Sequence, residues 1–348
     1  MAALWGNGTF QVALWALVKV VVILFTLLGV VSYLILAERK IMAHMQARVG
    51  PNRVGPFGML QPIADVLKLF FKEEFIPADA NKVLFHVAPM LAVVPAIVTF
   101  SVVPFGPPPV FVVTDISVGL LLFLAMSSLG VYAITLGGWS SNNKYALLGG
   151  LRSSAQMISY ELAMGLSTIP VLLESGTLSL NGIVAAQRGP LVVYGLTIPF
   201  LPNWMVLQPH LVLPFGVFLI TMFAETNRAP FDLPEAEGEL VAGFHVEYSS
   251  MKWALFFLGE YMNMIAISAI AITLFLGGWH GPGPEVLGLV WFVLKLAAFI
   301  FLFIWVRWTF PRLRYDQLMN LGWKVLLPVA LANVVIASVV VFARGHGG

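Results

Sequence analysis

The sequence of 348 residues contains no cysteine. Disulfide bonds, thiolate metal sites and iron–sulfur clusters ligated by this chain are therefore excluded. Charge is also scarce, because only 10% of the residues are Asp, Glu, Lys or Arg, against about 25% in soluble domains. The formal net charge of +2 is too small to indicate a nucleic-acid partner.

Motifs for nucleotides and catalytic metals are missing as well. The sequence has no G-x-G-x-x-G after a predicted strand, no P-loop and no H-E-x-x-H. Its six histidines fall on different predicted elements, without the pairing that a buried haem or metal requires. The N-terminus lacks a basic segment before its first apolar run, so we expect no cleaved signal peptide. We therefore expect any electrons or chemical fuel to come from a partner.

The sequence has an excess of long apolar segments. Hydrophobic residues make up 59% of the chain and gather in long uncharged runs, which suit helical crossings of about 20 residues. The runs do not alternate apolar and polar residues as membrane β-strands do. The sequence predicts an all-α polytopic membrane protein in which 1–348 form a single transmembrane bundle. About eight crossings are expected, at 12–37, 83–104, 116–136, 153–173, 206–223, 254–276, 286–306 and 325–342.

Basic residues give the predicted bundle an orientation. Fifteen of the 19 Lys and Arg fall in the four loops that follow the first, third, fifth and seventh crossings. The positive-inside rule places these loops in the cytoplasm and both termini on the outer side. The external stretch 175–208 is rich in Pro and Gly, so we expect an irregular connection there.

The first cytoplasmic loop, 38–82, contains a turn-rich connector, GPNRVGP, at 50–56. After it, apolar residues recur at helical spacing, namely Met59, Leu60, Ile63, Val66, Leu67 and Phe70. This pattern predicts an amphipathic helix that lies along the membrane surface. A simple interfacial anchor is the plainest interpretation of that helix.

The third cytoplasmic loop, 224–252, concentrates acids within an otherwise apolar chain. Its six carboxylates are Glu225, Asp232, Glu235, Glu237, Glu239 and Glu247. Glu161 and Glu260 fall inside predicted crossings, where ionisable groups are costly and mark paths for ions or protons. The joint pattern predicts a proton relay.

Two plainer interpretations of these acids stay open. A buried glutamate can be hydrogen-bonded, or paired with Lys19 or Lys295 in other crossings. The acids that follow Pro234 can also complement the positive N-terminus of a short helix.

Two long segments resemble the signatures of one family. The segment 58–73, GMLQPIADVLKLFFKE, is similar to the first signature of the H subunit (subunit 1 in mitochondria) of respiratory complex I, the proton-pumping NADH–quinone oxidoreductase. The segment 230–240, PFDLPEAEGEL, resembles the second. The segments 50–56, 146–161 and 310–324 also match, and the resemblance covers nearly the whole chain, including the eight crossings.

The resemblance implies a membrane subunit that forms the quinone tunnel and couples quinone reduction to proton pumping. The implied proton relay consists of Glu161, Glu225, Glu235, Glu237, Glu239, Glu247 and Glu260. The implied quinone tunnel consists of Glu38, Arg39, Arg48, Asp65, Arg228, Phe231 and Asp232. One family pattern has a further acid in the third crossing, where this chain has only Ser127 and Ser128.

The resemblance also implies the setting of the protein. Quinone is the expected substrate, no cofactor or metal is bound by this chain, and the iron–sulfur clusters and FMN lie in partner subunits. The expected partners are peripheral quinone-site and iron–sulfur subunits, antiporter-like membrane subunits and membrane lipid. A bacterial cell (inner) membrane is the expected location. The alternatives are a homologous component of a membrane-bound hydrogenase, a freestanding proton-coupled transporter and a purely structural membrane anchor.

Overall fold

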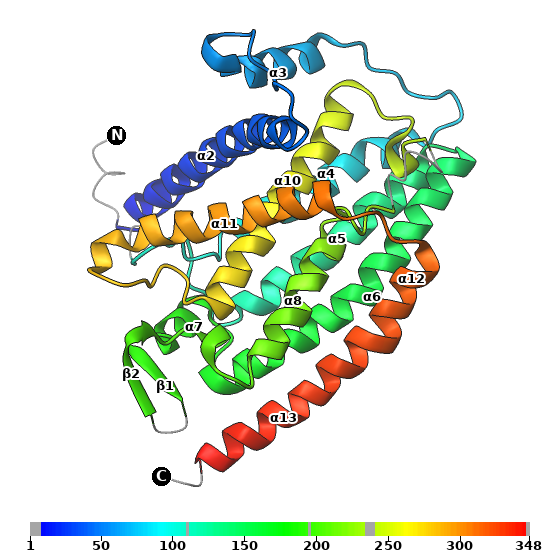
Figure 1. Ribbon diagram of the computed structural model, residues 1–348. Coiled ribbons are helices and arrows are strands. Elements are labelled where there is room, and N and C mark those ends of the chain that lie inside the picture. The colour runs from blue at the N-terminus through cyan, green and yellow to red at the C-terminus, as the bar shows by residue number, and fades with distance from the viewer. Residues whose placement is uncertain (1–7, 109–110, 194–195, 234–240, 346–348) are drawn as a thin grey trace. The chain divides into compact units, whose positions relative to one another are not determined.

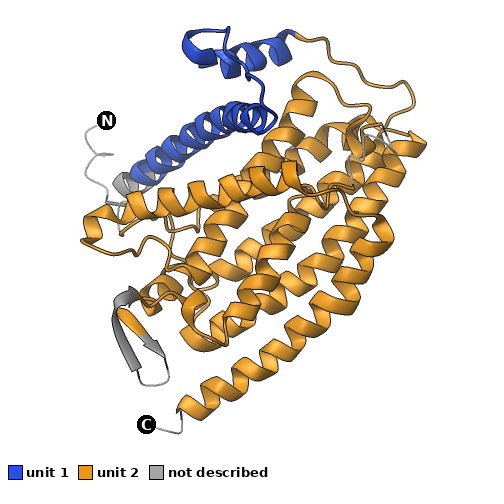
Figure 2. Cartoon of the chain, in the orientation of Figure 1, with its two compact units in different colours: residues 1–71 blue, residues 72–348 orange. Residues whose placement is uncertain are grey.

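The computed structural model describes residues 8–108, 111–193, 196–233 and 241–345. The chain divides into two compact units, residues 1–71 and 72–348 (Figure 2). A single bundle over 1–348 stays a prediction.

The first unit contains a long helix and a short amphipathic one. Its elements are α2 (Gly8–Met45), η1 (Pro56–Gly58) and α3 (Gln61–Phe71). The predicted amphipathic helix is thus confirmed as α3, whose side chains Ile63, Leu67 and Phe70 are exposed. In the connector, Gly58 has a φ of +76°, and a Cβ there would lie 2.2 Å from the carbonyl oxygen of Pro51. Only glycine fits this close approach of two backbone segments.

The second unit is built from long apolar helices joined by shorter segments (Figure 1). The helices are α4 (Lys82–Phe100), α5 (Gly119–Ser140), α6 (Lys144–Ser175), α7 (Leu180–Ala186), α8 (Val212–Glu225), α10 (Ser250–Phe275), α11 (Gly288–Thr309), α12 (Tyr315–Asn320) and α13 (Leu327–Gly345). Short 3-10 or π turns are η2 (Met205–Leu207), η3 (Gly243–His245), η4 (Glu285–Leu287) and η5 (Leu321–Leu326).

The predicted fold class, an all-α polytopic membrane protein, is confirmed. Every predicted crossing coincides with a helix over most of its length. Within the described residues, 6 helices are long and apolar enough to cross a membrane, and α6 with α7, bent by 58°, can make a seventh. The helix α8 is apolar but has only 14 residues.

Loops predicted on the same side of the membrane contact one another. At the end of the second unit that holds the predicted cytoplasmic loops, the amide of Asn81 donates to the carbonyl of Ser140 at 3.1 Å. The amide of Leu313 likewise donates to the carbonyl of Pro230 at 3.1 Å. This grouping agrees with the predicted alternation of the helices.

The stretch 175–208 was expected to be irregular, and this expectation is wrong. It forms α7, the antiparallel strands β1 (Pro190–Val193) and β2 (Leu196–Pro202), and η2. The buried side chain of Gln187 organises it, because its Nε2 donates to the carbonyl of Thr273 at 2.9 Å. Its Oε1 accepts from the amides of Gly277 at 2.8 Å and Met205 at 3.2 Å. The stretch 175–208 is therefore held by the hydrogen bonds of one buried amide and not by a periodic pattern in its own sequence.

A buried ammonium closes the loop after α10. Lys295 donates to the carbonyls of Leu276 at 2.6 Å, Gly278 at 2.9 Å and His280 at 2.6 Å. Burial, together with the positive charges of Arg188 and Lys295, lowers the pKa of the His280 imidazole to about 4. The loop is therefore built around one buried cation and a neutral imidazole.

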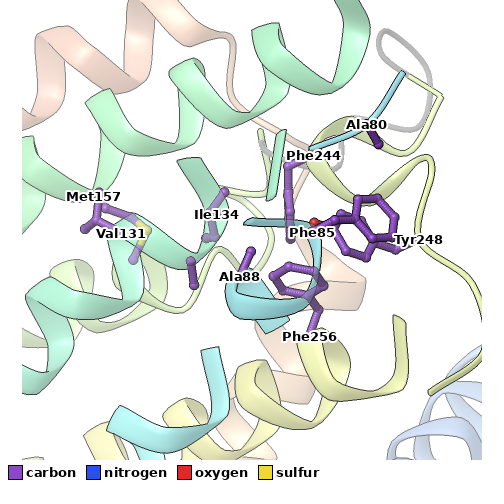
Figure 3. Packing of buried hydrophobic residues seen from close by; sticks show 10 residues of the cluster. Ala80, Phe85, Ala88, Val131, Ile134, Met157, Phe244, Tyr248 and Phe256 are labelled. Atoms are coloured by element: carbon purple, nitrogen blue, oxygen red, sulfur yellow. The ribbon is translucent and has the colours of Figure 1, made fainter. Parts of the chain in front are cut away.

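An apolar core lies at the end of the second unit where the acidic loop returns to the helices (Figure 3). The rings of Phe85 and Tyr248 stack with their centroids 4.0 Å apart, and Phe256 meets Tyr248 edge-on. The Tyr248 hydroxyl shares a 3.0 Å hydrogen bond with Ser140, and burial raises the pKa of Tyr248 to about 12. Phe244 packs on Phe256 and so fixes η3 beside the site described next.

Candidate functional site

The helix α8 ends in a buried acid. Glu225 is its last residue and is 7% exposed. The helix stops there because Asn227 adopts the left-handed conformation, with a φ of +51°, that often follows a helix C-terminus. The Ser127 hydroxyl donates to Glu225 Oε1 at 2.5 Å. The other carboxylate oxygen, Oε2, is buried and has no hydrogen-bond partner among the described residues.

A glutamine from α6 holds the turn that follows Glu225. Gln156 is 0% exposed, and its Nε2 donates to the carbonyls of Ala224 at 2.9 Å and Phe231 at 2.8 Å. The same nitrogen lies 3.2 Å from Asn227 Oδ1. One side chain therefore joins the two ends of the turn.

The second acid, Glu260 on α10 (Ser250–Phe275), is partly exposed and is paired with an arginine from that turn. Arg228 Nε lies 2.7 Å from Glu260 Oε1, and Arg228 is only 3% exposed. The guanidinium also lies over the ring of Tyr261, 4.3 Å from its centroid. The partner of Glu260 is thus Arg228 and not Lys295, whose ammonium binds backbone carbonyls.

The third acid, Glu161 on α6, accepts a hydrogen bond from the Ser128 hydroxyl. Ser127 and Ser128 are neighbours on α5, so one helix contacts the carboxylates of two others. Glu161 also lies close enough to Glu225 for their charges to interact. The structure therefore brings Glu161, Glu225 and Glu260 into one site.

Two small cavities meet at Glu225. One offers about 60 Å³ to the centres of water molecules and is lined by Glu225, Glu260 and His245. The other offers about 20 Å³ and is lined by Glu225, Ser127 and Asn263. A water molecule requires about 10–15 Å³ of such space, so the first cavity has room for a few waters and the second for one.

Of the remaining predicted relay acids, the structure describes only Glu247, which lies apart from this site. Glu247 accepts from Asn143 Nδ2 at 2.7 Å and lines a separate open groove with Asp79 and Lys144. The other three, Glu235, Glu237 and Glu239, lie outside the described residues.

Two of the predicted tunnel residues support the turn after α8. Asp232 Oδ2 lies 3.0 Å from Arg312 Nη2, and Phe231 packs edge-on against Tyr160 with ring centroids 5.5 Å apart. The Tyr160 hydroxyl donates to the carbonyl of Leu318 at 2.8 Å, which fixes α12 against α6.

Four predicted tunnel residues lie in the first unit. Arg39 Nη1 and Asp65 Oδ2 form an ion pair at 2.7 Å that ties α2 to α3. Glu38 precedes Arg39 on α2. Arg48, in the turn after α2, donates to Gln46 Oε1 at 2.8 Å.

An ion pair that the sequence did not predict lies at the end of the second unit that holds the predicted cytoplasmic loops. Lys252, at the start of α10, pairs with Glu74 and lies 3.0 Å from His86 Nε2. An ammonium only donates, so Nε2 accepts, and His86 Nδ1 donates to the carbonyl of Lys82 at 2.5 Å. The contact joins α4 and the segment before it to the start of α10.

Uncharged polar residues of this site were not predicted. The sequence pointed to Ser127 and Ser128 only as polar residues in a crossing where one family pattern has an acid. It did not point to Gln156 and Asn227, because the prediction was based on ionisable groups. Hydroxyl and amide side chains inside a crossing also need hydrogen-bond partners, and that requirement is the signal that points to them.

The fold and site define a multi-pass helical membrane protein whose interior holds a linked group of carboxylates beside water-sized cavities. The chain belongs to the NADH dehydrogenase family, whose model matches residues 18–338. Among its relatives, one of the NADH-quinone oxidoreductase H subunits of Geobacter metallireducens is 54% identical over 94% of this chain and 97% of the relative. The NADH-quinone oxidoreductase H subunits of Rickettsia canadensis and Rhodospirillum rubrum are 52% and 51% identical, over 99% and 97% of this chain and the same shares of those relatives.

Proposed function

We propose that this chain is the membrane subunit of a proton-translocating NADH–quinone oxidoreductase and couples quinone reduction to proton movement. Membership of the NADH dehydrogenase family supports the complex, as do the names of the relatives. The relay is supported above all by Glu225, which is buried, has one unpartnered oxygen among the described residues and borders two water-sized cavities. A carboxyl group in such a site can hold a proton and exchange it with water.

The proposed relay begins at the larger cavity. Water in this cavity brings a proton to Glu225, and the ion pair of Arg228 with Glu260 lies beside it. Reducing a quinone to a quinol consumes two electrons and two protons, and the protons are taken from nearby groups, so the charge near the acidic loop changes. That change alters the protonation of Glu225 and Glu161 and is passed to antiporter-like subunits alongside. Glu235, Glu237, Glu239 and Glu247 remain proposed members of the relay.

The quinone route is a separate part of the proposal. An isoprenoid tail needs apolar surface, and the exposed side chains of Ile63, Leu67 and Phe70 on α3 supply it. The Arg39–Asp65 pair places polar groups on the helix that carries this surface. The other tunnel residues are proposed on the family resemblance, namely Glu38, Arg48, Arg228, Phe231 and Asp232.

The proposed setting is a bacterial inner membrane, with both termini on the outer side. Peripheral subunits that carry the iron–sulfur clusters and FMN dock on the cytoplasmic loops, and this chain itself binds no cofactor. Purification in mild detergent tests this setting, because the chain should be recovered together with iron–sulfur partners. Recovery of the chain alone as an active transporter would overturn it.

The relay is tested by Glu225→Gln in membrane vesicles, which keeps the shape of the side chain and removes its proton exchange. Glu285→Gln is the matched control, because Glu285 is exposed, lies at the other end of the second unit and pairs with Arg188. We expect proton pumping to fall at least about 10²-fold for Glu225→Gln, the lower end of the usual range of about 10²–10⁴ for acid–base residues, and not to fall for the control. Normal NADH–quinone turnover and normal pumping in Glu225→Gln would refute the relay.

A further inference from the structure

Two adjacent hydroxyls on α5 reach two acids on different helices. Ser127 donates to Glu225 at the end of α8, and Ser128 donates to Glu161 in the middle of α6. Consecutive helical residues point about 100° apart, so two successive positions on α5 can face two different neighbouring helices. The pair occupies the third predicted crossing, which has no acid of its own.

The Ser128 hydroxyl has a second acceptor besides Glu161. Its oxygen also lies 3.0 Å from the carbonyl of Leu124, and a hydroxyl has a single hydrogen to donate. When Glu161 is ionised, the hydrogen points to the carboxylate. When Glu161 is protonated, the carboxyl donates to Ser128 Oγ and the hydroxyl hydrogen returns to Leu124. The serine therefore accommodates both states of the acid without moving the helix.

Ser128 has the carbonyl of Leu124 as its second acceptor, whereas the Ser127 hydroxyl borders a cavity. It lines the cavity of about 20 Å³ together with Glu225 and Asn263. A water in this cavity would have the polar side chains of Ser127, Glu225 and Asn263 around it, and those of Thr99 and Thr226 line the same cavity, which supplies the partners that a buried water requires. Ser127 can thus donate to ionised Glu225, or turn to this water and accept from the protonated acid.

We propose that Ser127 and Ser128 are the positioning residues that couple Glu161 to Glu225, a role that rests on the proposed relay. Each hydroxyl holds one carboxylate, so the two like charges stay close enough to influence each other. A proton that binds Glu225 removes its negative charge, which stabilises the ionised form of Glu161 and turns Ser128 toward it. For each proton bound at Glu225, the partly exposed Glu161 releases one proton to the adjoining water, and the exchange involves no electron transfer.

The test uses Ser127→Ala and Ser128→Ala in the assembled complex in vesicles, compared at equal complex content. Ser268→Ala is the matched control, because Ser268 is buried on α10 and its hydroxyl donates only to the carbonyl of Met264, at 2.7 Å, among the described residues. The readouts are protons pumped per NADH oxidised and the infrared difference band of protonated carboxyl groups. The threonine variants at both positions restore the hydroxyl.

Either alanine variant is expected to lower pumping about tenfold, the effect of losing one charge-assisted hydrogen bond. It should also change the carboxyl band, and threonine should restore both. The double alanine variant should be no worse than either single variant, because the two hydroxyls act as one unit.

Alanine variants that pump like Ser268→Ala, with an unchanged carboxyl band, would overturn the inference. If Glu225→Gln abolishes pumping in the same vesicles, the proposed relay survives that result and only the role of the serines fails. If Glu225→Gln itself pumps normally, the relay and the inference fail together.

Discussion

Gln156 offers the most direct test of how the site is held. Its side-chain amide donates to both ends of the turn between α8 and Asp232, through the carbonyls of Ala224 and Phe231. Replacing it by Met keeps the volume and removes the donor. We expect the turn to loosen and Glu225 to leave its position between the two cavities.

The magnitude follows from the bonds that are lost. Gln156→Met removes hydrogen bonds to Ala224, Phe231 and Asn227, each worth about 0.5–1.5 kcal/mol net. The two carbonyls keep one backbone donor each, from Asn227 and Leu233, so the full cost of orphaned groups is avoided. A loss of about 2–3 kcal/mol is expected, or roughly 30- to 150-fold in the unfolding equilibrium.

The assay is thermal unfolding in detergent, together with proton pumping by the complex in vesicles. Gln317→Met is the control, because the exposed Gln317 accepts from the backbone of Arg314 within its own helical turn. Gln156→Glu is the informative second variant, since it keeps the shape but cannot donate through a carboxylate. If Gln156→Met is as stable and as active as the control, or if Gln156→Glu behaves as wild type, the reasoning is refuted.

Arg228→Met removes the cation beside Glu260. Such a loss costs about 3–5 kcal/mol in a fully buried ion pair. Because Glu260 is partly exposed, we expect a loss of stability in thermal unfolding at the lower end of that range. Adding Glu260→Gln should recover part of the loss, and no recovery would contradict the pairing. The pKa of His280 is lowered to about 4 from an unfolded value near 6.5, so its contribution to stability is present above pH 6.5 and is lost as the pH falls toward 4. His280→Gln should reduce the change in the unfolding temperature between pH 4 and pH 6.5. An unchanged pH dependence of the unfolding temperature would argue against the lowered pKa of His280. Gly58→Ala would force a Cβ to 2.2 Å from a carbonyl oxygen at a positive φ, and it should destabilise the connector by at least about 1–2 kcal/mol. Proteolysis within 50–58 should then become faster than in Gly29→Ala, whose added Cβ meets nothing within 4 Å, and equal rates would contradict the steric argument.

The helices were predictable because their signal is local. Uncharged runs such as 83–104 and 254–276 identify their own crossings, and the helical spacing after 58 identifies α3. Helix ends were less predictable. The helix α6 begins at Lys144, well before the expected start at 153, because Asn143 caps it through its side chain.

The site was only partly predictable. The scarcity of charge made Glu161, Glu225 and Glu260 conspicuous, since each stands among apolar residues. Their partners were not visible, because an ion pair such as Arg228–Glu260 joins residues far apart in the chain. The regular structure of 175–208 was not predictable for the same reason, because Gln187 holds this stretch through contacts with the end of α10.

The sequence by itself determined that this chain is a polytopic helical membrane protein, where its acids fall, and which family it resembles. Those properties depend on composition, on short-range periodicity and on contiguous motifs. Only the tertiary structure decided that Glu225 lies between two cavities, that Arg228 holds Glu260, and that two uncharged serines contact two acids. Hydrogen bonds of a few ångströms depend on how helices pack, and helix packing is set by many weak contacts that no single segment encodes.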